Sequence, residues 1–254
     1  MDLPVNRFKR ALREGRPQIG LWSVLAHAGV TELLGGAGFD WLCLDMEHAP
    51  NELPDVQAQL QALRGSATAP IVRPPWNDMV WVKRVLDLGA QTLLIPYVQT
   101  AAEAAQAVSY MRYPPAGRRG VAGGTRATQW RRIRDYYKQV EEELCLLVQV
   151  ESRQGLENLD AIAATPGVDG VFIGPADLSA DLGHLGNPQH PEVQAAIEDA
   201  VRRIRASGKA AGILARGEEA ARRWIGAGCD FVAVGVDAVL LAQAADGLSA
   251  KFRT

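Results

Sequence analysis

The sequence predicts a single (β/α)8 (TIM) barrel of the α/β class over residues 1–254, with an extra helix at the N-terminus. Three observations favour this fold. The chain has 254 residues, about the length that one such barrel needs. Short runs rich in Val, Ile, Leu and Phe recur along it, and segments of helical character separate them. These runs lack polar alternation, which is typical of parallel strands covered on both faces.

The elements alternate along the whole chain. Eight apolar runs are interpreted as strands, at residues 18–23, 40–45, 70–74, 91–96, 144–150, 169–174, 209–214 and 230–235. Eight stretches are interpreted as amphipathic helices, at 27–37, 52–64, 78–88, 100–112, 154–163, 191–206, 217–227 and 237–250. An additional helix at 4–14 and an extra segment at 130–143 should decorate the barrel.

Local signals support several of the helix boundaries. Asn77 and Asp78 are residue types that cap a helix N-terminus, and Gly89 follows the apolar face of that helix. Pro191 suits a first helical turn, and Gly208 follows the helix that ends near residue 206.

A doubly wound open sheet is the structural alternative. It normally carries a glycine-rich phosphate loop after an early strand. No such loop follows the first apolar run, and the glycines at 35–38 end a helix instead of starting one. Closure into a barrel is therefore the favoured reading.

Composition narrows the class of partner. The net charge is −2, and the densest basic stretch, at 131–134, is short and followed by acidic residues, which argues against nucleic acid or a membrane surface. No apolar stretch approaches the ~20 residues of a membrane span, and the first residues do not resemble a secretory signal. Cys43, Cys145 and Cys229 lie in or beside apolar runs, which predicts free buried thiols and a cytoplasmic protein.

Polar side chains gather where the predicted strands end. Barrel active sites form at the C-terminal ends of the strands, so these residues should share one rim. The rim should hold Trp22, Asp45, Glu47, His48, Arg73, Gln149, Glu151, Asp177 and Leu214.

Glu151 and Asp177 are candidate metal ligands because they follow neighbouring strands. Two carboxylates without clustered histidines or cysteines suggest a hard, oxygen-ligated ion such as Mg²⁺ or Mn²⁺. The alternative is that each acid only caps the following helix.

Arg73 and His48 are the other reactive candidates. A guanidinium at position 73 could bind a carboxylate or stabilise an enolate oxygen, although it could instead form an internal ion pair with Asp45 or Glu47. His48 could exchange protons near neutral pH. Two further histidines, His184 and His190, are interpreted as loop residues. No lysine is placed for Schiff-base chemistry, so an aldolase with this sequence should use a metal.

Five segments together resemble the 4-hydroxy-2-oxoheptanedioate aldolase family of class II pyruvate aldolases. They are FDWLCLDMEHAPN at 39–51, VRP at 72–74, RYPPAGRRG at 112–120, VQVE at 148–151 and GVFIGPADLS at 170–179. The likeness extends over almost the whole chain and includes GNPQHPE at 186–192.

The resemblance implies a role for each rim residue. Glu151 and Asp177 would hold the divalent ion, Mg²⁺ or Mn²⁺, with Co²⁺ also allowed. Arg73 would bind pyruvate and steady its enolate, Gln149 would contact pyruvate, and His48 would transfer protons. The pyruvate carboxylate would be bound by backbone groups of Gly174, Pro175, Ala176 and Asp177. Asp45 and Asp87 would support His48. Trp22 and Leu214 would form the apolar walls of the aldehyde site.

The resemblance also implies the reaction and the assembly. The expected activity is reversible aldol cleavage of 4-hydroxy-2-oxo acids to pyruvate and an aldehyde, with hydroxypyruvate as another donor to test. The expected assembly is a homohexamer, a trimer of dimers with exchanged C-terminal helices. Position 46 is methionine, where the heptanedioate enzymes usually have glycine, so the aldehyde preference of those enzymes transfers less securely to this chain. Two alternatives stay open: an acyl-CoA lyase of the citrate or malyl-CoA type, and a non-catalytic metabolite-binding barrel.

Overall fold

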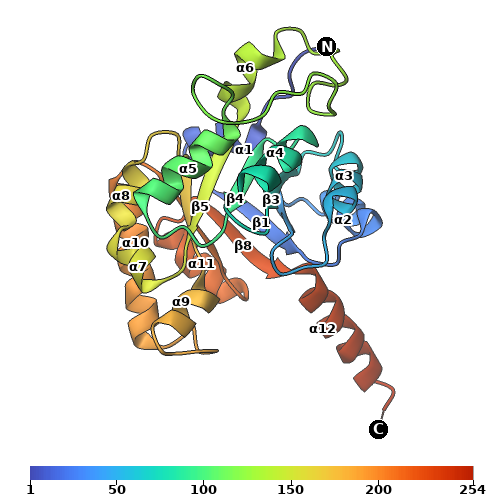
Figure 1. The fold of residues 1–254 in the computed structure, drawn as a ribbon. Coiled ribbons are helices and arrows are strands. Elements are labelled where there is room, and N and C mark those ends of the chain that lie inside the picture. Colours follow the sequence, from blue (N-terminus) through green and yellow to red (C-terminus); the bar gives the residue numbers. More distant parts are fainter. Residues whose placement is uncertain (254) are drawn as a thin grey trace.

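Eight parallel strands close into a barrel in the computed structural model, which describes residues 1–253 (Figure 1). Each strand pairs with its neighbours in sequence, and the first closes on the last. The strands are β1 (Gln18–Ser23), β2 (Trp41–Asp45), β3 (Ala69–Arg73), β4 (Thr92–Ile95), β5 (Cys145–Val150), β6 (Gly170–Ile173), β7 (Ala210–Leu214) and β8 (Phe231–Val236). The predicted (β/α)8 class is confirmed, and every predicted strand is present within one or two residues at each end.

Within residues 1–253, twelve helices surround the barrel or extend from it. They are α1 (Arg7–Arg13), α2 (Ala28–Gly35), α3 (Leu53–Ala62), α4 (Met79–Asp87), α5 (Ala101–Met111), α6 (Tyr136–Glu143), α7 (Arg153–Glu157), α8 (Leu159–Ala164), α9 (Pro175–Asp181), α10 (Pro191–Ala206), α11 (Glu218–Gly226) and α12 (Asp237–Ala250). Asp78 caps α4 as predicted, by accepting hydrogen bonds from two backbone amides, whereas Asn77 donates to the Glu103 carbonyl oxygen.

Aromatic side chains fill the barrel interior. Trp41, Phe172 and Phe231 are almost fully buried there, and Phe8 of α1 closes the N-terminal end with its ring 5.6 Å from that of Phe231. A Cβ atom at Gly20 would collide with the Trp41 ring, so the strand needs glycine at this position. The packed interior confines chemistry to the rim.

Three helical segments differ from the prediction. The expected helix at 154–163 is divided at Asn158, whose amide donates to the Gln99 carbonyl oxygen at 2.9 Å. The segment at 130–143, for which no helix was predicted, is helical from Tyr136; positive φ angles at Trp130, Arg131 and Asp135 keep the residues before it out of a helix. Helix α9 was not predicted; it starts with a proline at its first position, which suits a helix N-terminus.

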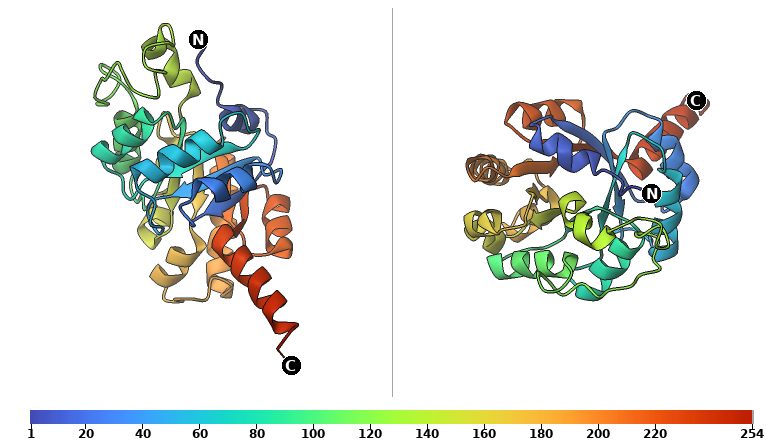
Figure 2. Two further views of the ribbon diagram at one scale, coloured as in Figure 1. Left: turned by 90° about the vertical axis from the view of Figure 1, so that its right-hand side faces the viewer. Right: turned by 90° about the horizontal axis from the view of Figure 1, so that it is seen from above.

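Helix α12 projects away from the barrel (Figures 1 and 2). Its start is held by Asp237, whose carboxylate accepts hydrogen bonds from Ser23 Oγ and from the Val24 and Leu25 amides. Beyond that residue the helix is exposed, including Leu241 at 60% and Leu248 at 59%. No helix within residues 1–253 is long and apolar enough to span a bilayer. The three cysteines are free and buried, as predicted.

Candidate active site

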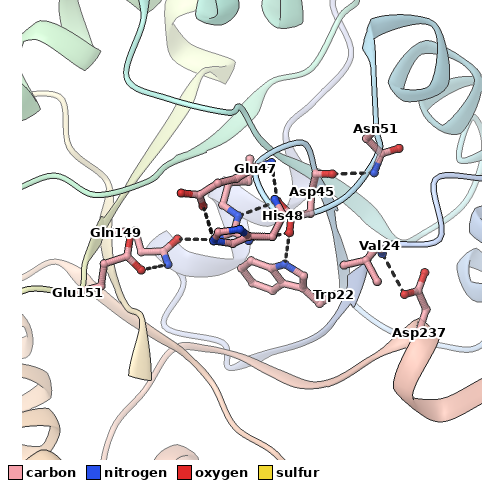
Figure 3. A network of polar contacts seen from close by, with 10 residues as sticks. Trp22, Val24, Asp45, Glu47, His48, Asn51, Gln149, Glu151 and Asp237 are labelled. Carbon is pink, nitrogen blue, oxygen red and sulfur yellow. Dashed lines mark hydrogen bonds and ion pairs between the residues drawn. The ribbon is translucent and has the colours of Figure 1, made fainter. Parts of the chain in front are cut away.

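A cavity of about 180 Å³ opens at the C-terminal rim of the strands. Most of the predicted site residues line it, including Trp22, His48, Arg73, Gln149, Gly174, Pro175, Ala176, Asp177 and Leu214. Figure 3 shows that several of these side chains converge from β1, β2 and β5. The volume is below the ~300–1,000 Å³ typical of drug-sized ligands, which indicates a small substrate.

Arg73 and Asp45 form a buried ion pair at the ends of β3 and β2. The Arg73 Nε and Nη2 atoms donate to the two Asp45 carboxylate oxygens at 2.8 and 2.6 Å. Burial alone would raise the pKa of Asp45, but the hydrogen bonds and charge of Arg73 outweigh it and lower the pKa. The Arg73 guanidinium also lies 4.9 Å from the centre of the Trp22 ring, whose Nε1 donates to Asp45 at 3.1 Å. Arg73 is thereby fixed in orientation.

Glu47 completes a cluster that the sequence only partly indicated. Its Oε2 atom lies 2.6 Å from Arg73 Nη1, without the alignment of a hydrogen bond. Burial raises the pKa of Glu47, and the charges of Asp45 and Asp177 add to this effect, while Arg73 and His48 oppose it. The internal ion pair considered for Arg73 therefore exists with both Asp45 and Glu47.

Glu151 is a second buried acid at the rim. Its Oε1 accepts a hydrogen bond at 3.0 Å from the backbone amide of Tyr97, and its Oε2 accepts one from Gln149 Nε2. Tyr97 has φ of 53°, and this left-handed conformation accompanies the donation of its amide to the carboxylate. Burial, reinforced by the negative charges of Asp177 and Glu47, raises the pKa of Glu151 to about 8.

Gly174 brings the next strand end close to this acid. A Cβ atom here would collide with Glu151 Oε2 and crowd Gln149 Nε2. The missing side chain lets the start of α9 approach Glu151, and α9 carries Asp177 in its exposed first turn. Asp177 lines the cavity, and Glu151 lies close enough for the charge of Asp177 to act on its carboxylate.

His48 lies at the mouth of the cavity with a side chain that is 64% exposed. Its Nε2 is 3.9 Å from Glu47, while the Asp45 carboxylate meets only its backbone amide, at 3.4 Å. The imidazole is therefore free to meet a substrate, and its nearest acid is Glu47.

Asp87 is the one predicted site residue that lies away from this rim. It ends α4, which runs from the end of β3 back towards the start of β4, at the opposite end of the barrel. There its carboxylate accepts a hydrogen bond at 3.0 Å from Arg119. Asp87 is therefore not close to His48 of the same chain, where the sequence resemblance expected it to support that residue.

Two further sequence features have defined places. Met46 is buried in the core between the sheet and the helices and does not line the cavity. His184 and His190 stack with ring centres 3.5 Å apart, and His184 lies 2.9 Å from Glu192. Within residues 1–253, His184, His190 and Glu192 are the one group of three side chains close enough together to hold a metal ion, and they lie in and after the loop that lines one side of the cavity.

Lysine is absent from the part of the cavity wall that the structure describes. Lys9 and Lys209 lie at the N-terminal end of the barrel, bound to backbone carbonyl oxygens of Leu144 and Val168. The prediction that no lysine is placed for a Schiff base agrees with this arrangement.

Known proteins share both the sequence and this architecture. Residues 18–244 match the HpcH/HpaI aldolase/citrate lyase family. The chain belongs to this family. It is 58% identical over 248 residues to a 4-hydroxy-2-oxo-heptane-1,7-dioate aldolase of Klebsiella pneumoniae, covering 97% of this chain and 94% of that protein.

Two further proteins are similar to the chain. A hydroxypyruvate/pyruvate aldolase of Pseudomonas aeruginosa is 58% identical over 254 residues, which cover all of this chain and 95% of that one. A family member from Burkholderia cenocepacia superposes with a TM-score of 0.95 at 42% identity, over 98% of this chain and 100% of that structure. The resemblance seen in the sequence is confirmed, and the relatives are named aldolases, a class of carbon–carbon lyase.

Proposed function

We propose that this chain is a metal-dependent pyruvate aldolase that cleaves 4-hydroxy-2-oxo acids to pyruvate and an aldehyde, and runs the reverse addition. The observation that supports it most directly is the buried Glu151. Its pKa is raised by burial and by the charge of Asp177, and its carboxylate accepts a hydrogen bond from Gln149, which lines a small cavity together with Arg73 and Asp177. The names of the relatives support the same reaction class and differ over the substrate.

The residues fit a divalent cation. Four carboxylates, those of Asp45, Glu47, Glu151 and Asp177, share the rim with one buried arginine, which leaves an excess of negative charge. Burial raises the pKa of Glu151, and repulsion from Asp177 and Glu47 raises it further; a cation would relieve that repulsion. Oxygen donors suit Mg²⁺ or Mn²⁺ and also admit Co²⁺. Glu151 and Asp177 would hold the ion, which supplies Lewis acidity that makes the pyruvate C3 proton easier to remove.

The donor half of the reaction depends on the buried polar groups. Arg73 has its Nη1 atom directed towards Glu47 and Gln149, and a bound pyruvate oxygen would take up this donor in the cavity. Its fixed charge would stabilise the enolate oxygen. Gln149 would donate a hydrogen bond to pyruvate inside the cavity. The backbone amides of Ala176 and Asp177 lie in the first turn of α9 and have no acceptor within the helix, so they can bind the pyruvate carboxylate.

The acceptor half takes place at the open side of the cavity. His48 is exposed there. Either His48 or a water molecule would accept the pyruvate C3 proton when the enolate forms, and His48 can donate a proton to the alkoxide that forms when the enolate attacks an aldehyde carbonyl. Trp22 and Leu214 form apolar walls beside it. Cleavage uses the same residues in the opposite direction.

Pyruvate methyl-proton exchange in D₂O tests the proposal without knowledge of the aldehyde. We expect Mg²⁺-loaded protein to exchange the methyl protons, and metal-stripped protein and Glu151→Gln to exchange them at least a hundredfold more slowly. Proton NMR follows the signal. Glu157→Gln, the same substitution at an exposed acid of α7, is the matched control and should retain exchange.

The outcomes separate the alternatives. A folded, metal-loaded protein that shows no exchange would contradict the aldolase proposal and favour an acyl-CoA lyase or a binding-only barrel. The small cavity and the aldolase names of the relatives give the lyase alternative less support.

Self-association is proposed from α12. The helix exposes Val239, Leu240, Leu241 and Leu248, and burying each such side chain is worth about 1.5–3 kcal/mol. A second copy of this chain is the partner that the sequence resemblance predicts for this surface, within a hexamer.

The three buried free thiols also support a reducing compartment such as the cytoplasm.

Leu241→Glu tests this association. A charge on the exposed helix face should lower the assembly's mass, as measured by size-exclusion chromatography with light scattering, without unfolding a barrel that does not contain the residue. Gln243→Glu adds the same charge to the same helix as a control. A wild-type monomer, or an unchanged mass in Leu241→Glu, would contradict the proposal.

A further inference from the structure

Arg216 is a second cation in the wall of the cavity. It follows β7 at the C-terminal rim and lines the cavity beside Leu214 and Ala215. No ion pair or side-chain hydrogen bond within residues 1–253 involves its guanidinium, whereas Arg73 is held by two acids. An arginine without a protein partner at a substrate cavity is available to an anionic ligand.

The polar groups around Arg216 have partners of their own. Glu218, two residues further along the chain, pairs with Arg222 at 2.8 Å. Gln194, across the cavity on α10, accepts from Arg223 at 2.6 Å and donates to the Pro188 carbonyl oxygen. Glu219 is the remaining acid of the α11 first turn and is exposed to solvent. The guanidinium of Arg216 is therefore not neutralised by these neighbours.

The position of Arg216 relates it to the metal-binding acids. Ile173 of β6 pairs with Ile213 of β7, so Asp177 and Arg216 follow neighbouring strand ends at a similar height. The cavity wall that they share is largely apolar and includes Phe172, Leu214, Ile197 and Trp224. A ligand with one end at Asp177 and the other at Arg216 would contact these apolar side chains in between.

We propose that Arg216 binds the far end of the acceptor, so that the enzyme prefers aldehydes with an anionic group remote from the carbonyl. This inference rests on the proposed aldolase function. The apolar wall suits a short aliphatic chain, and a guanidinium binds a carboxylate or a phosphate through two parallel hydrogen bonds. Arg216 is thus a specificity residue, separate from the groups that act on pyruvate.

Arg216→Met tests the assignment with three acceptors in pyruvate aldol addition. Succinic semialdehyde carries a carboxylate, glyceraldehyde 3-phosphate carries a phosphate, and butanal is uncharged. We expect kcat/KM for the anionic acceptor that the wild type prefers to fall about tenfold or more, mainly through KM. The ratio of anionic to neutral acceptor is the readout, and Arg216→Lys should retain part of it. A preference for succinic semialdehyde identifies a carboxylate ligand, and one for the phosphate ester identifies a phosphate ligand.

Arg202→Met is the matched control, since it removes the same charge from an exposed arginine on α10. It should leave the ratio unchanged. Equal losses for butanal and the anionic aldehydes in Arg216→Met, or no loss for any, would overturn the inference. Wild-type pyruvate exchange in D₂O, measured without aldehyde, tests the aldolase function separately, so failure of that function is distinguishable from failure of the Arg216 assignment.

Discussion

Arg73→Lys should lower the rate of pyruvate methyl-proton exchange by about a hundredfold or more. Lysine keeps the positive charge but loses the planar fork whose Nε and Nη2 atoms hold Asp45 while Nη1 points towards Glu47 and Gln149. A compact ammonium group cannot serve the two acids and an enolate oxygen from one position. Removing one oxyanion-stabilising donor typically costs 10²–10³ in rate. NMR exchange at saturating Mg²⁺ measures the effect.

The lysine variant is preferable to Arg73→Ala. Alanine would leave Asp45 and Glu47 buried without their partner, and breaking a buried pair costs about 3–5 kcal/mol. A loss of activity in Arg73→Ala would then mix chemistry with unfolding.

Arg203→Lys is the control for this experiment. Arg203 also makes a two-point contact, to Asp160 at 2.8 Å and to the Leu156 carbonyl oxygen at 2.9 Å, on helices outside the cavity. Thermal unfolding of both variants should show similar small losses, and only Arg73→Lys should lose exchange. Near-normal exchange in Arg73→Lys would remove Arg73 from the reaction.

The barrel could be predicted because its signals are local. Each strand is a short apolar run, and the register of β2 on β3 places Asp45 beside Arg73. The shared rim follows from strand direction alone. Gln149 and Asp177, which line the cavity, and Glu151, which contacts Gln149, could therefore be assigned to one rim. The order of the strands and the location of barrel active sites at the C-terminal strand ends were sufficient to predict where these residues lie.

Other parts of the site depend on contacts that sequence does not encode locally. Tyr97 reaches Glu151 through its backbone amide in a left-handed conformation, and nothing in a tyrosine side chain signals that role. Glu47 was visible at the rim, but its closeness to Arg73 depends on the turn after β2. Asp87 shows the reverse case: the family resemblance suggested a site residue, but its helix carries it to the other end of the chain's own barrel.

Metal binding should be linked to the protonation of Glu151. With its pKa raised to about 8 from an ordinary 4.5, the buried acid is mostly protonated at neutral pH in metal-free protein. The folded form then binds a proton that the unfolded form lacks, so Glu151's contribution to stability is present below about pH 4.5 and is lost as the pH rises through about 8. A cation must displace this proton, because only the carboxylate binds a metal.

Affinity for Mn²⁺ should therefore rise about tenfold per pH unit between about pH 5 and 8, and level off above that range. Calorimetric titration in two buffers of different ionisation enthalpy should detect about one proton released per ion near pH 6.5. Glu151→Gln keeps an oxygen for the Tyr97 amide but cannot ionise, so it should lose both the affinity and the proton release. Glu157→Gln should behave as wild type. Tight binding with no pH dependence in the wild-type protein would show that Glu151 is not a ligand whose proton must leave, and would move the metal site away from β5.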